Sequence, residues 1–421
     1  GSTWPGHLGL FLDRNLFSFF AGKIKKRIII VAGTNGKTTT SKMIRDVLEK
    51  KGNLVLHNES GANLLNGIAS VFLTNYSFKT KYIADYAIFE IDEATLSSFL
   101  AAFNHHELTV VLLNLFRDQL DRYGEVDNIA RRWQETAKKL DRSCILILNA
   151  DDPQIASIGD KVFCPLLFFG MENEKLFLAE EEHATDSVYC LNCGSRLSYE
   201  GIYYSHVGIW SCPNCQAKRP KPTLSLISAV LPGLYNYYNT LATILTLDSL
   251  GISQLHAQNL LKEFKPAFGR QEEVTVQNKK IKIFLAKNPV GMNESLKTIL
   301  DLKKNLSGRN KLVVILALND NIPDGRDVSW IWDVDLEKFV LSCQTIICSG
   351  IRAADMSVRV KYALLANNLK DWEKIIIVEN NLGKAIEIGV SRLEKDETLV
   401  LLPTYSAMLE ARKILGGKKI L

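Results

Sequence analysis

The sequence predicts an α/β protein in which a mainly parallel sheet forms the centre of each of two domains. Short β-branched runs alternate with helical patterns along most of the chain. These runs lack the polar alternation of a strand that faces solvent. The alternation starts near Lys26, stops between about Glu180 and Pro222, and starts again near Lys280. The interruption contains four cysteines, so we interpret it as an insertion with its own fold.

These breaks define the expected domains. A chain of 421 residues is long enough for two or three of them. The first domain is expected at residues 1–280 and carries the insertion at about residues 186–222. The second domain is expected at residues 281–421.

In the first series each expected strand is a short apolar run. Arg27–Ala32 contains three consecutive isoleucines, as expected for a strand that helices cover on both faces. A helix follows at once and ends before Gly52. The expected elements are a strand at Arg27–Ala32, a helix from Thr38 to about Lys50, and strands at Ala87–Ile91, Thr109–Asn114 and Cys144–Asn149.

The second series repeats the same rhythm after a helical pattern that resumes at about Asn236. Its runs are again rich in isoleucine, leucine and valine, and helical patterns separate them. The expected strands are Ile281–Leu285, Leu312–Leu318, Thr345–Cys348, Ile375–Val378 and Leu399–Leu402.

Two apolar stretches raise the question of membrane insertion or secretion. Leu8–Phe20 is broken by Asp13 and Arg14, so we do not expect a secretory signal there. Thr223–Leu247 carries no charge and is long enough to span a bilayer. However, its proline, glycine, asparagines and tyrosines predict a buried loop and helix instead.

Composition places the chain among globular proteins, with 47% hydrophobic and 23% charged residues. The net charge of +5 is too small to argue for nucleic-acid binding by itself, and we expect no nucleic-acid partner. It is compatible with an anionic substrate or an anionic membrane surface. Four cysteines outside the insertion sit alone in apolar stretches and are expected to be buried thiols in a reducing compartment: Cys144, Cys164, Cys343 and Cys348.

A glycine-rich turn between the first expected strand and its helix carries the features of a phosphate-binding loop. Glycines let backbone N–H groups point at phosphates, and the helix N-terminus adds positive potential. Lys37 is expected to reach the β- and γ-phosphates, and Thr38 to ligate Mg²⁺. Only the end of the general pattern is present, because Val31 stands where its first glycine would be. The candidate nucleotide ligands are Gly33, Thr34, Asn35, Gly36, Lys37, Thr38 and Thr39.

The spelling Gly-Thr-Asn-Gly-Lys-Thr-Thr resembles the Mur ligase and folylpolyglutamate synthetase superfamily, in which this loop binds ATP. The resemblance implies a magnesium-binding glutamate at the end of a later strand. Glu90 is the best match, and Glu93 is the alternative. A carboxylate at the carboxyl end of a strand beside a phosphate loop suits this task.

Two further segments resemble the family and differ from it at single positions. Asn114–Tyr123 resembles a metal-binding segment, but Gln119 replaces its histidine, which puts a second magnesium in doubt. Asn236 and Asn239 lie three residues apart, hence on one helix face, and their amides suit an adenine edge. Tyr235 replaces the histidine of that motif.

Two cationic residues complete the set that the resemblance implies. Gly269-Arg270 resembles the hinge whose arginine reaches the γ-phosphate, where a guanidinium would offset transition-state charge. Phe284 stands at the place of the family's ribose-binding aspartate, and Lys287 at the place of its histidine. A lysine at that position could meet a phosphate instead.

The insertion contains two Cys-x-x-Cys pairs separated by 18 residues. Two such pairs with a strand-like segment between them, Gly201–Trp210, predict a zinc ribbon. Four thiolates close the coordination sphere, so we expect a structural Zn²⁺ rather than a catalytic one. A redox dithiol and a nucleic-acid-binding ribbon are weaker alternatives. The expected ligands are Cys190, Cys193, Cys212 and Cys215.

Three features resemble the MurT family within this superfamily. The phosphate loop begins at Gly33, which leaves no room for a uridine-nucleotide domain before it. A cysteine insertion is present, and Asn319–Asp333 contains two tryptophans and four aspartates. The resemblance implies a Mur ligase-like central ATPase domain with a zinc ribbon and a Rossmann-like C-terminal domain. An exposed functional loop is expected at Asn319–Asp333, although a turn leading into an amphipathic helix would also explain it.

The resemblance also implies an activity and a partner. The chain would use ATP to phosphorylate the α-carboxylate of D-isoglutamate in lipid II, and ammonia from a GatD-like glutaminase would give D-isoglutamine. We find no cysteine nucleophile with a partnered histidine here, so ammonia should come from that partner. The family is thought to lend a loop aspartate to the glutaminase, and we favour Asp327, with Asp324 second.

The expected location is the cytoplasm, with peripheral contact at the inner face of the plasma membrane through the lipid-linked substrate. Two alternatives stay open at this point. The chain could be another ligase of the superfamily that adds an amino acid to a folate-like or peptide acceptor. It could also be a zinc-ribbon ATPase that binds nucleic acid, although a clear basic patch with stacking aromatics is not found.

Overall fold

The computed structural model describes residues 3–13, 15–58, 62–103, 106–118, 126–180, 182–267, 269–276, 278–306, 311–394 and 397–416. The chain forms two compact units. The first comprises Gly1–Phe116, Tyr123–Glu181 and Thr185–Lys265, and the second comprises Arg117–Arg122, Glu182–Ala184 and Pro266–Leu421.

In the described part of the first unit, six parallel strands form a sheet in the order β2-β3-β1-β4-β5-β6. The first strand, β1, lies between β3 and β4, so the chain leaves it in one direction and later returns on its other side. The bounds of the six strands are β1 Ile24–Ala32, β2 Val55–His57, β3 Ala84–Ile91, β4 Leu108–Leu112, β5 Ile145–Asn149 and β6 Leu166–Phe169. The position of β1, with β3 on one side and β4 on the other, is a topological switch point of the sheet. Sheets of this α/β type usually bind their ligands at such a point.

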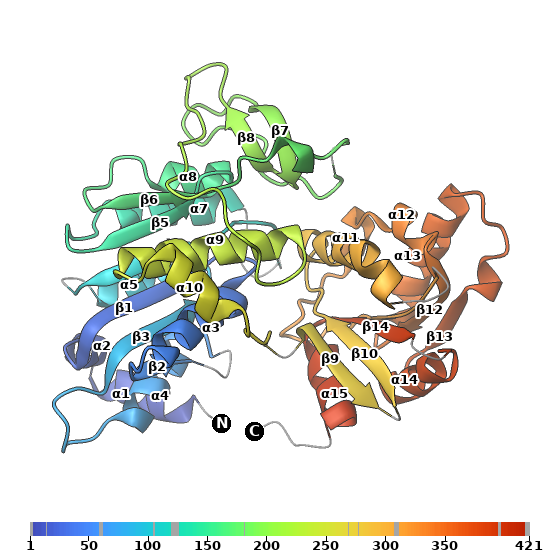
Figure 1. The fold of residues 1–421 in the computed structure, drawn as a ribbon, viewed down its shortest axis with the longest axis horizontal. Helices are drawn as coiled ribbons and strands as arrows, with labels where there is room; N and C mark the ends of the chain where they lie inside the picture. Colours follow the sequence, from blue (N-terminus) through green and yellow to red (C-terminus); the bar gives the residue numbers. More distant parts are fainter. Residues whose placement is uncertain are drawn as a thin grey trace. The chain divides into compact units, whose positions relative to one another are not determined.

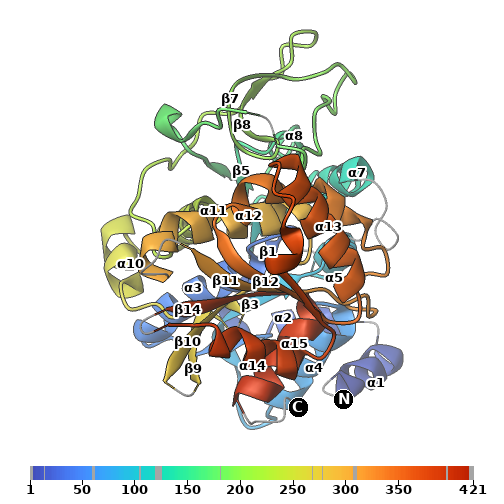
Figure 2. The same ribbon diagram turned by 90° about the vertical axis from the view of Figure 1, so that its right-hand side faces the viewer.

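Helices cover both faces of this sheet (Figures 1 and 2). One face packs on a cluster rich in phenylalanine from α2, α4, α5 and α7, which includes Phe72 and Phe99. On the other face α9 packs along α3 and α10. The helices are α1 Trp4–Leu12, α2 Leu16–Ala21, α3 Lys37–Lys50, α4 Leu65–Asn75, α5 Leu96–Ala102, α7 Val126–Ala137, α8 Pro153–Ile158, α9 Leu234–Ser249 and α10 Gln254–Leu261, with a 3-10 turn at Glu174–Leu176.

The cysteine insertion forms an antiparallel hairpin of β7 (Ser198–Tyr204) and β8 (Val207–Ser211) (Figure 1). We expected one strand-like segment at Gly201–Trp210, and the structure has two strands joined by a turn at Ser205, whose φ is +50°.

The sheet of the second unit has the order β13-β12-β11-β14-β10-β9 in its described residues, and only β9 runs antiparallel to its neighbour. This mixed sheet agrees with the predicted C-terminal α/β unit. The bounds are β9 Arg270–Val276, β10 Lys279–Phe284, β11 Leu312–Ala317, β12 Cys343–Ser349, β13 Ile376–Glu379 and β14 Thr398–Pro403.

Helices α11, α12 and α13 pack on one face of this sheet, and α14 and α15 pack on the other (Figure 2). The helices are α11 Pro289–Leu306, α12 Leu336–Val340, α13 Ala353–Ala366, α14 Leu382–Ser391 and α15 Tyr405–Gly416, and 3-10 turns lie at Ser329–Asp333 and Trp372–Lys374. The second unit begins at Pro266, ahead of the boundary expected at residue 280, because β9 pairs with β10.

The uncharged stretch Thr223–Leu247 forms a loop followed by α9, whose side chains are mostly buried, as predicted. None of the helices built from described residues combines the length and apolar character that a bilayer crossing needs. The four isolated cysteines are free and buried, which confirms the predicted burial: Cys144, Cys164, Cys343 and Cys348.

Candidate functional site

The phosphate loop lies at the carboxyl end of β1. Asn114, which follows the neighbouring strand β4, holds this loop through hydrogen bonds. The backbone N–H of Asn35 donates to Asn114 Oδ1 at 2.8 Å, and Asn114 Nδ2 donates back to the carbonyl of Asn35 at 3.0 Å. The Thr34 N–H donates to the Asn114 carbonyl at 3.0 Å. Three hydrogen bonds between the loop and Asn114, two donated by the loop and one by Asn114, therefore hold the loop in a defined shape before any nucleotide arrives.

Two glycines of the loop have backbone conformations that other residues rarely adopt. Gly33 has φ of +141°, and a Cβ there would stand 3.0 Å from the backbone of Asn114. Gly36 has φ of +92° and comes directly before α3, and a Cβ there would stand 2.1 Å from Asn239 Oδ1. The turn therefore needs glycine both for its backbone angles and for its close neighbours.

Lys37 begins α3, and its ammonium group is largely shielded from solvent. Lys37 Nζ donates to the Gly33 carbonyl at 2.5 Å and lies 3.2 Å from a carboxylate oxygen of Glu93. The side chains of Lys37 and Glu93 are 11% and 6% exposed. The cation is therefore held at the loop by an acidic partner that a nucleotide phosphate could replace.

Thr38 and Glu90 bring two oxygen donors together beside the loop. Thr38 Oγ1 donates to Glu90 Oε2 at 2.7 Å. Asn58, at the end of β2, fixes the backbone of Glu90, because it donates to the Glu90 carbonyl at 2.9 Å and accepts from the Glu90 N–H at 3.0 Å. A hydroxyl and a carboxylate are the oxygen donors that Mg²⁺ prefers, so this pair fits a magnesium ion.

The structure thus gives the two candidate glutamates different neighbours. Glu90 contacts the threonine expected to ligate magnesium, and Glu93 contacts Lys37. Thr39 is 3% exposed and lies in the buried part of α3. Asn58 was not predicted from the sequence, since its role comes from the neighbouring strand and not from any motif.

The two asparagines of α9 lie together, and one of them reaches the loop. Asn239 Nδ2 donates to Asn236 Oδ1 at 3.2 Å, and Asn236 Nδ2 donates to the Pro232 carbonyl at 2.7 Å. Asn239 Oδ1 lies beside Gly36 and accepts from Thr40 Oγ1 at 3.5 Å. Both side chains are buried, at 2% and 3% exposure.

A buried ion-pair network joins the end of β5, the insertion and α9. Asp151 accepts from Arg219 Nε at 2.6 Å, from the Tyr238 hydroxyl at 2.6 Å and from the Met171 N–H at 2.7 Å. Burial raises the pKa of Asp151, while the Arg219 charge opposes that rise. Burial, followed by the Asp151 charge, raises the pKa of Tyr238 well above its usual range. This network fixes the insertion to the sheet and α9 of the first unit.

Sequence reasoning missed that network. The available signal was two consecutive aspartates and a proline directly after a strand, at Asp151, Asp152 and Pro153. Asp152 caps α8 by accepting from the N–H groups of Gln154 and Ile155. His206 Nε2 lies 3.5 Å from an oxygen of Asp152 and is buried, so it belongs to this network rather than to the cysteine cluster.

The four cysteines of the insertion converge, with their sulfur atoms all within 4.8 Å of one another. Cys190 and Cys215 are 3.6 Å apart, and Cys193 and Cys212 are 3.5 Å apart. Zinc–sulfur bonds in a tetrahedron place sulfurs about 3.8 Å apart, so the cluster fits a Cys₄ metal site. Hydrogen bonds from Ser195 lower the pKa of the Cys193 thiol to about 5, whereas burial raises the pKa of Cys190, so the match to a metal site rests on the sulfur geometry.

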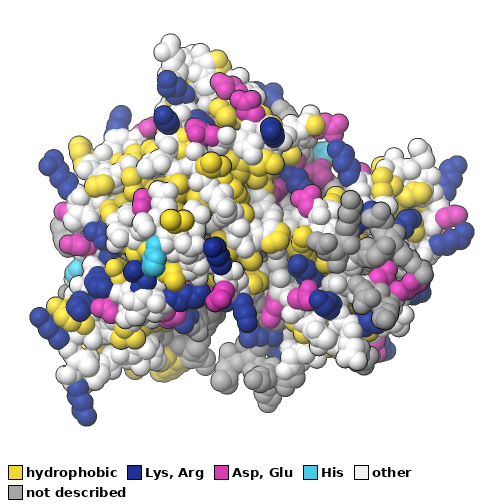
Figure 3. Space-filling model, viewed as in Figure 1, with side chains coloured by type: hydrophobic (Ala, Val, Ile, Leu, Met, Phe, Trp, Pro, Cys, Tyr) yellow, Lys and Arg dark blue, Asp and Glu magenta, His cyan; other side chains and the backbone are white. Residues whose placement is uncertain are grey.

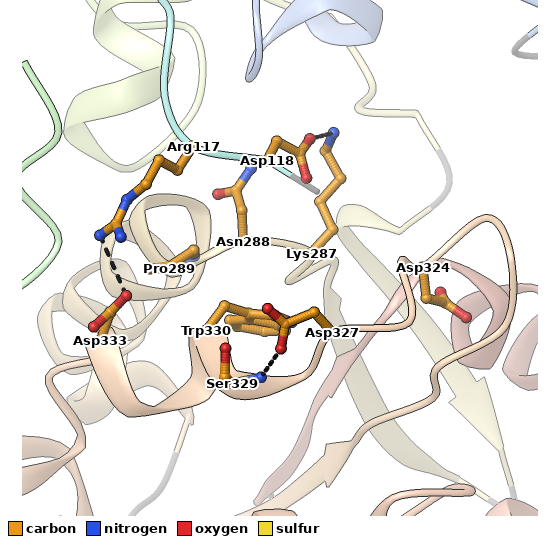
Figure 4. Close-up of a pocket in the computed structure, with 10 residues that line it drawn as sticks. All are labelled: Arg117, Asp118, Lys287, Asn288, Pro289, Asp324, Asp327, Ser329, Trp330 and Asp333. Atoms are coloured by element: carbon orange, nitrogen blue, oxygen red, sulfur yellow. Dashed lines mark hydrogen bonds and ion pairs between the residues drawn. The ribbon is translucent and has the colours of Figure 1, made fainter. Parts of the chain in front are cut away.

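In the second unit, residues before α11 and residues of the loop after β11 line a cavity of about 70 Å³ (Figure 4). Lys287 pairs with Asp118, and Arg117 Nη2 lies 3.2 Å from Asp333 Oδ2. Arg270 opens β9 in the same unit. The lining residues are Arg117, Asp118, Lys287, Asn288, Pro289, Asp324, Asp327, Ser329, Trp330 and Asp333.

The structure separates the two candidate loop aspartates. Asp324 is 4% exposed and accepts from the Ser406 N–H at 2.7 Å and from the Ser406 hydroxyl, and burial raises its pKa. Asp327 is exposed and accepts from the Ser329 N–H at 2.8 Å, which lowers its pKa. Asp324 therefore holds the loop to α15, whereas Asp327 presents an ionised carboxylate at the surface.

Part of one predicted motif falls outside the described residues. Gln119 and the rest of its segment through Tyr123 belong to that part, as does Phe268 beside Gly269. Asn114, Arg117 and Asp118 of the same motif are described, and they occupy the positions given above.

A switch-point loop with a lysine, a threonine and a nearby glutamate, on a sheet followed by a second α/β unit, is the arrangement of a Mur ligase. Residues 31–247 match the model of the Mur ligase middle domain, and residues 285–408 match the model of the MurT ligase C-terminal domain. The chain belongs to the MurT family of Mur ligases.

Two relatives cover nearly the whole chain. The MurT subunit of lipid II isoglutaminyl synthase (glutamine-hydrolyzing) from Staphylococcus aureus strain COL is 33% identical over 97% of this chain and 91% of its own length. The corresponding subunit from Streptococcus pneumoniae strain R6 is 32% identical over 100% of this chain and 93% of its own length. UDP-N-acetylmuramate–L-alanine ligases match a smaller part, with 24% identity over 59% of this chain for that of Caldicellulosiruptor bescii.

Solved structures share the fold. A pseudomurein peptide ligase type C from Methanothermus fervidus superposes with a TM-score of 0.68 at 22% identity, covering 95% of this chain and 80% of that one. The MurF ligase of Thermotoga maritima, solved with ADP, superposes with a TM-score of 0.60 at 14% identity, covering 96% and 83%. Membership of the Mur ligase family implies ATP and Mg²⁺ as the nucleotide and its metal.

Proposed function

We propose that this chain is the ATP-using subunit of an enzyme that amidates lipid II. It phosphorylates the α-carboxylate of the D-isoglutamate residue, and ammonia then converts the acyl phosphate to D-isoglutamine. The relatives that match over nearly all of the chain carry the name of such a synthase. The observation that carries the proposal is the preformed phosphate loop, with Lys37 and the Thr38–Glu90 pair beside it.

The chemistry follows from the weakness of a carboxylate as an acceptor for ammonia. A carboxylate oxygen attacks the γ-phosphorus of ATP, and the bond to the ADP oxygen breaks. The ammonia nitrogen then attacks the acyl carbon, phosphate leaves with the bonding electrons, and the nitrogen loses a proton. Lys37 offsets charge on the phosphates once it leaves Glu93, and loop N–H groups orient them. We assign Arg270 and Lys287 to phosphate binding as well.

Two metals fit the residues present. Thr38 and Glu90 would hold Mg²⁺, which supplies charge neutralisation at the phosphates. Asn236 and Asn239 are assigned to the adenine, because their buried amides offer both donors and acceptors. The four cysteine thiolates would hold Zn²⁺ in a closed, structural site.

Ammonia is proposed to come from a GatD-like glutaminase that binds this subunit. The exposed carboxylate of Asp327 would orient the histidine of the partner's cysteine–histidine pair, as an aspartate does in hydrolase triads. Because the substrate is lipid-linked, we place the reaction at the cytoplasmic face of the membrane.

The test is amidation of lipid II with ATP and glutamine, by the chain with and without a co-expressed glutaminase, followed by mass spectrometry of the product. We expect amide only when both subunits are present, or when ammonium salt replaces glutamine and the glutaminase. A Lys37→Ala variant of the complex should form none while still hydrolysing glutamine. Transfer of an amino acid without ammonia would instead favour another ligase of the superfamily.

A further inference from the structure

Helix α1 packs on α4 through two glycines, and its Leu10 packs against the core of the first unit. A Cβ on Gly6 would stand 1.8 Å from the Asn66 carbonyl oxygen of α4, and the Gly6 N–H donates to Ser70 Oγ at 2.7 Å. A Cβ on Gly9 would stand 2.7 Å from Leu73 Cδ1. The two glycines are one turn apart, so they form the face of α1 that touches the protein.

The opposite face of α1 carries four exposed large apolar side chains. Trp4 is 70% exposed, Leu8 48%, Phe11 84% and Leu12 73%. Their spacing of four, seven and eight residues from Trp4 places them on one side of a helix. A helix that only stabilised the fold would bury these residues and expose small or polar ones, so the pattern points to a partner outside this chain.

A second group of aromatic side chains lies on α2 and on the loop between α4 and β3, and both α1 and α2 pack on α4. The Tyr76 ring contacts both phenylalanines: its centroid lies 5.7 Å from that of Phe19 and 4.9 Å from that of Phe78. Phe78 is 94% exposed. Figures 1 and 2 place α1 beside α4, and the α4–β3 loop extends from the end of that helix.

Cationic side chains lie beside the second aromatic group. Lys23 Nζ lies 5.2 Å from the centre of the Phe19 ring, and Lys79 and Lys81 are exposed next to Phe78. Figure 3 shows Lys or Arg side chains at the end of the α4–β3 loop, at the lower left. Two acids lie in this region: Asp13, next to Leu12, is exposed and accepts from the Asn15 N–H at 2.8 Å, and Asp85 lies 3.6 Å from Lys25.

We propose that this apolar-basic surface binds a membrane that contains anionic lipid. The surface comprises Trp4, Leu8, Phe11, Leu12, Phe19 and Phe78 with Lys23, Lys79 and Lys81. Tryptophan, phenylalanine and leucine enter the boundary between headgroups and acyl chains, and lysines pair with the headgroups. A protein partner is the weaker explanation, because the centres of protein interfaces are depleted in lysine.

The inference concerns binding to the bilayer itself and stands apart from the proposed amidation. The full chain is floated with vesicles of phosphatidylcholine alone or of equimolar phosphatidylcholine and phosphatidylglycerol, with no lipid II and no ATP. We expect flotation with the anionic vesicles only. Added salt should release the protein, since each lysine near the surface contributes about fivefold to partitioning at low salt.

Variants distinguish binding through this surface from nonspecific adsorption of the protein to vesicles. Leu8→Ser with Phe11→Ser should lower partitioning by at least about tenfold, because two apolar side chains no longer enter the boundary. Lys79→Glu with Lys81→Glu should lower it similarly for anionic vesicles. The control pair is Leu226→Ser with Leu255→Ser, which removes two leucines of the same unit that are 80% and 72% exposed. All variants should melt at the temperature of the unchanged protein.

Several outcomes would overturn the proposal. Flotation that is absent, or that the α1 variant leaves unchanged, would reject a lipid surface. Self-association that the α1 variant abolishes would assign the face to a second copy of the chain. Loss of glutaminase binding in that variant, with no vesicle binding by the unchanged protein, would assign it to the partner subunit.

Discussion

The side-chain oxygen of Asn239 stands where a Cβ on Gly36 would have to be, with only 2.1 Å between the two positions. Gly36 is the last residue before α3, and Asn239 belongs to α9. The phosphate loop and the candidate adenine residues are therefore fitted to each other. A substitution at either of these two positions should therefore displace the side chain or backbone at the other.

Gly36→Ala should weaken binding of a non-hydrolysable ATP analogue by at least about tenfold, because the new Cβ meets Asn239 and the φ of +92° disfavours alanine. Isothermal titration calorimetry measures the change. The control is Gly52→Ala, which has a positive φ of +78° but nothing within 4 Å of the added Cβ. Equal affinities for Gly36→Ala and the unchanged chain would show that the loop does not hold the nucleotide.

Asp327→Asn should lower glutamine hydrolysis by the complex at least about a hundredfold, because an amide cannot orient a partner histidine as a carboxylate does. ATP binding and the melting temperature should stay unchanged, since Asp327 is exposed. Asp324→Asn should instead lower the melting temperature, because it weakens the bonds to Ser406. Asp371→Asn serves as the control, being a 79% exposed aspartate of the same unit. Full glutaminase activity in Asp327→Asn would remove the assignment.

Purified chain should contain about one zinc ion, as a closed Cys₄ site does. Elemental analysis measures the content, and Cys212→Ser should lose the metal and melt at a lower temperature. Cys348→Ala, which changes a buried thiol of the second unit, should keep its zinc. A fully folded chain without metal, melting at the same temperature after chelation, would contradict a structural role.

His57 should make the first unit less stable in mild acid. Both of its ring nitrogens lack a hydrogen-bond partner in the part of the chain that the structure describes, and burial, aided by the Arg45 charge, lowers its pKa to about 4. The unfolded chain then binds more protons than the folded one between about pH 6.5 and 4, so stability is lost as pH falls through that window.

From about pH 7.5 to pH 5, the free energy of unfolding should fall by about 2 kcal/mol more in the unchanged protein than in His57→Gln. Urea denaturation at each pH measures the difference. His256→Gln, at an exposed position, is the matched control. Identical pH profiles for the unchanged protein and His57→Gln would mean that this ring is not buried neutral.

Local sequence was sufficient for features whose geometry is itself local. A strand, a Gly-Lys-Thr turn and a helix follow one another within a few residues, so the phosphate loop could be predicted from its spelling and context. The cysteine cluster was predictable for the same reason, since each knuckle is a short turn that brings two thiols together. The sequence suggested Asp327 as a candidate, but it did not reveal that its carboxylate is exposed while that of Asp324 is buried.

Tertiary structure alone decided which distant side chains complete the site. Asn58 reaches Glu90 because β2 and β3 are neighbours, and Arg219 reaches Asp151 because the insertion folds back on the end of β5. Asp324 and Asp327 are three residues apart, yet Asp324 accepts from the Ser406 hydroxyl of α15, whereas Asp327 is exposed. Sequence by itself determined the glycine-rich loop, the paired cysteine turns and the alternation of strands and helices, because near neighbours encode them. Strand order and burial determined the partners of each polar group, because those depend on residues far apart in the chain.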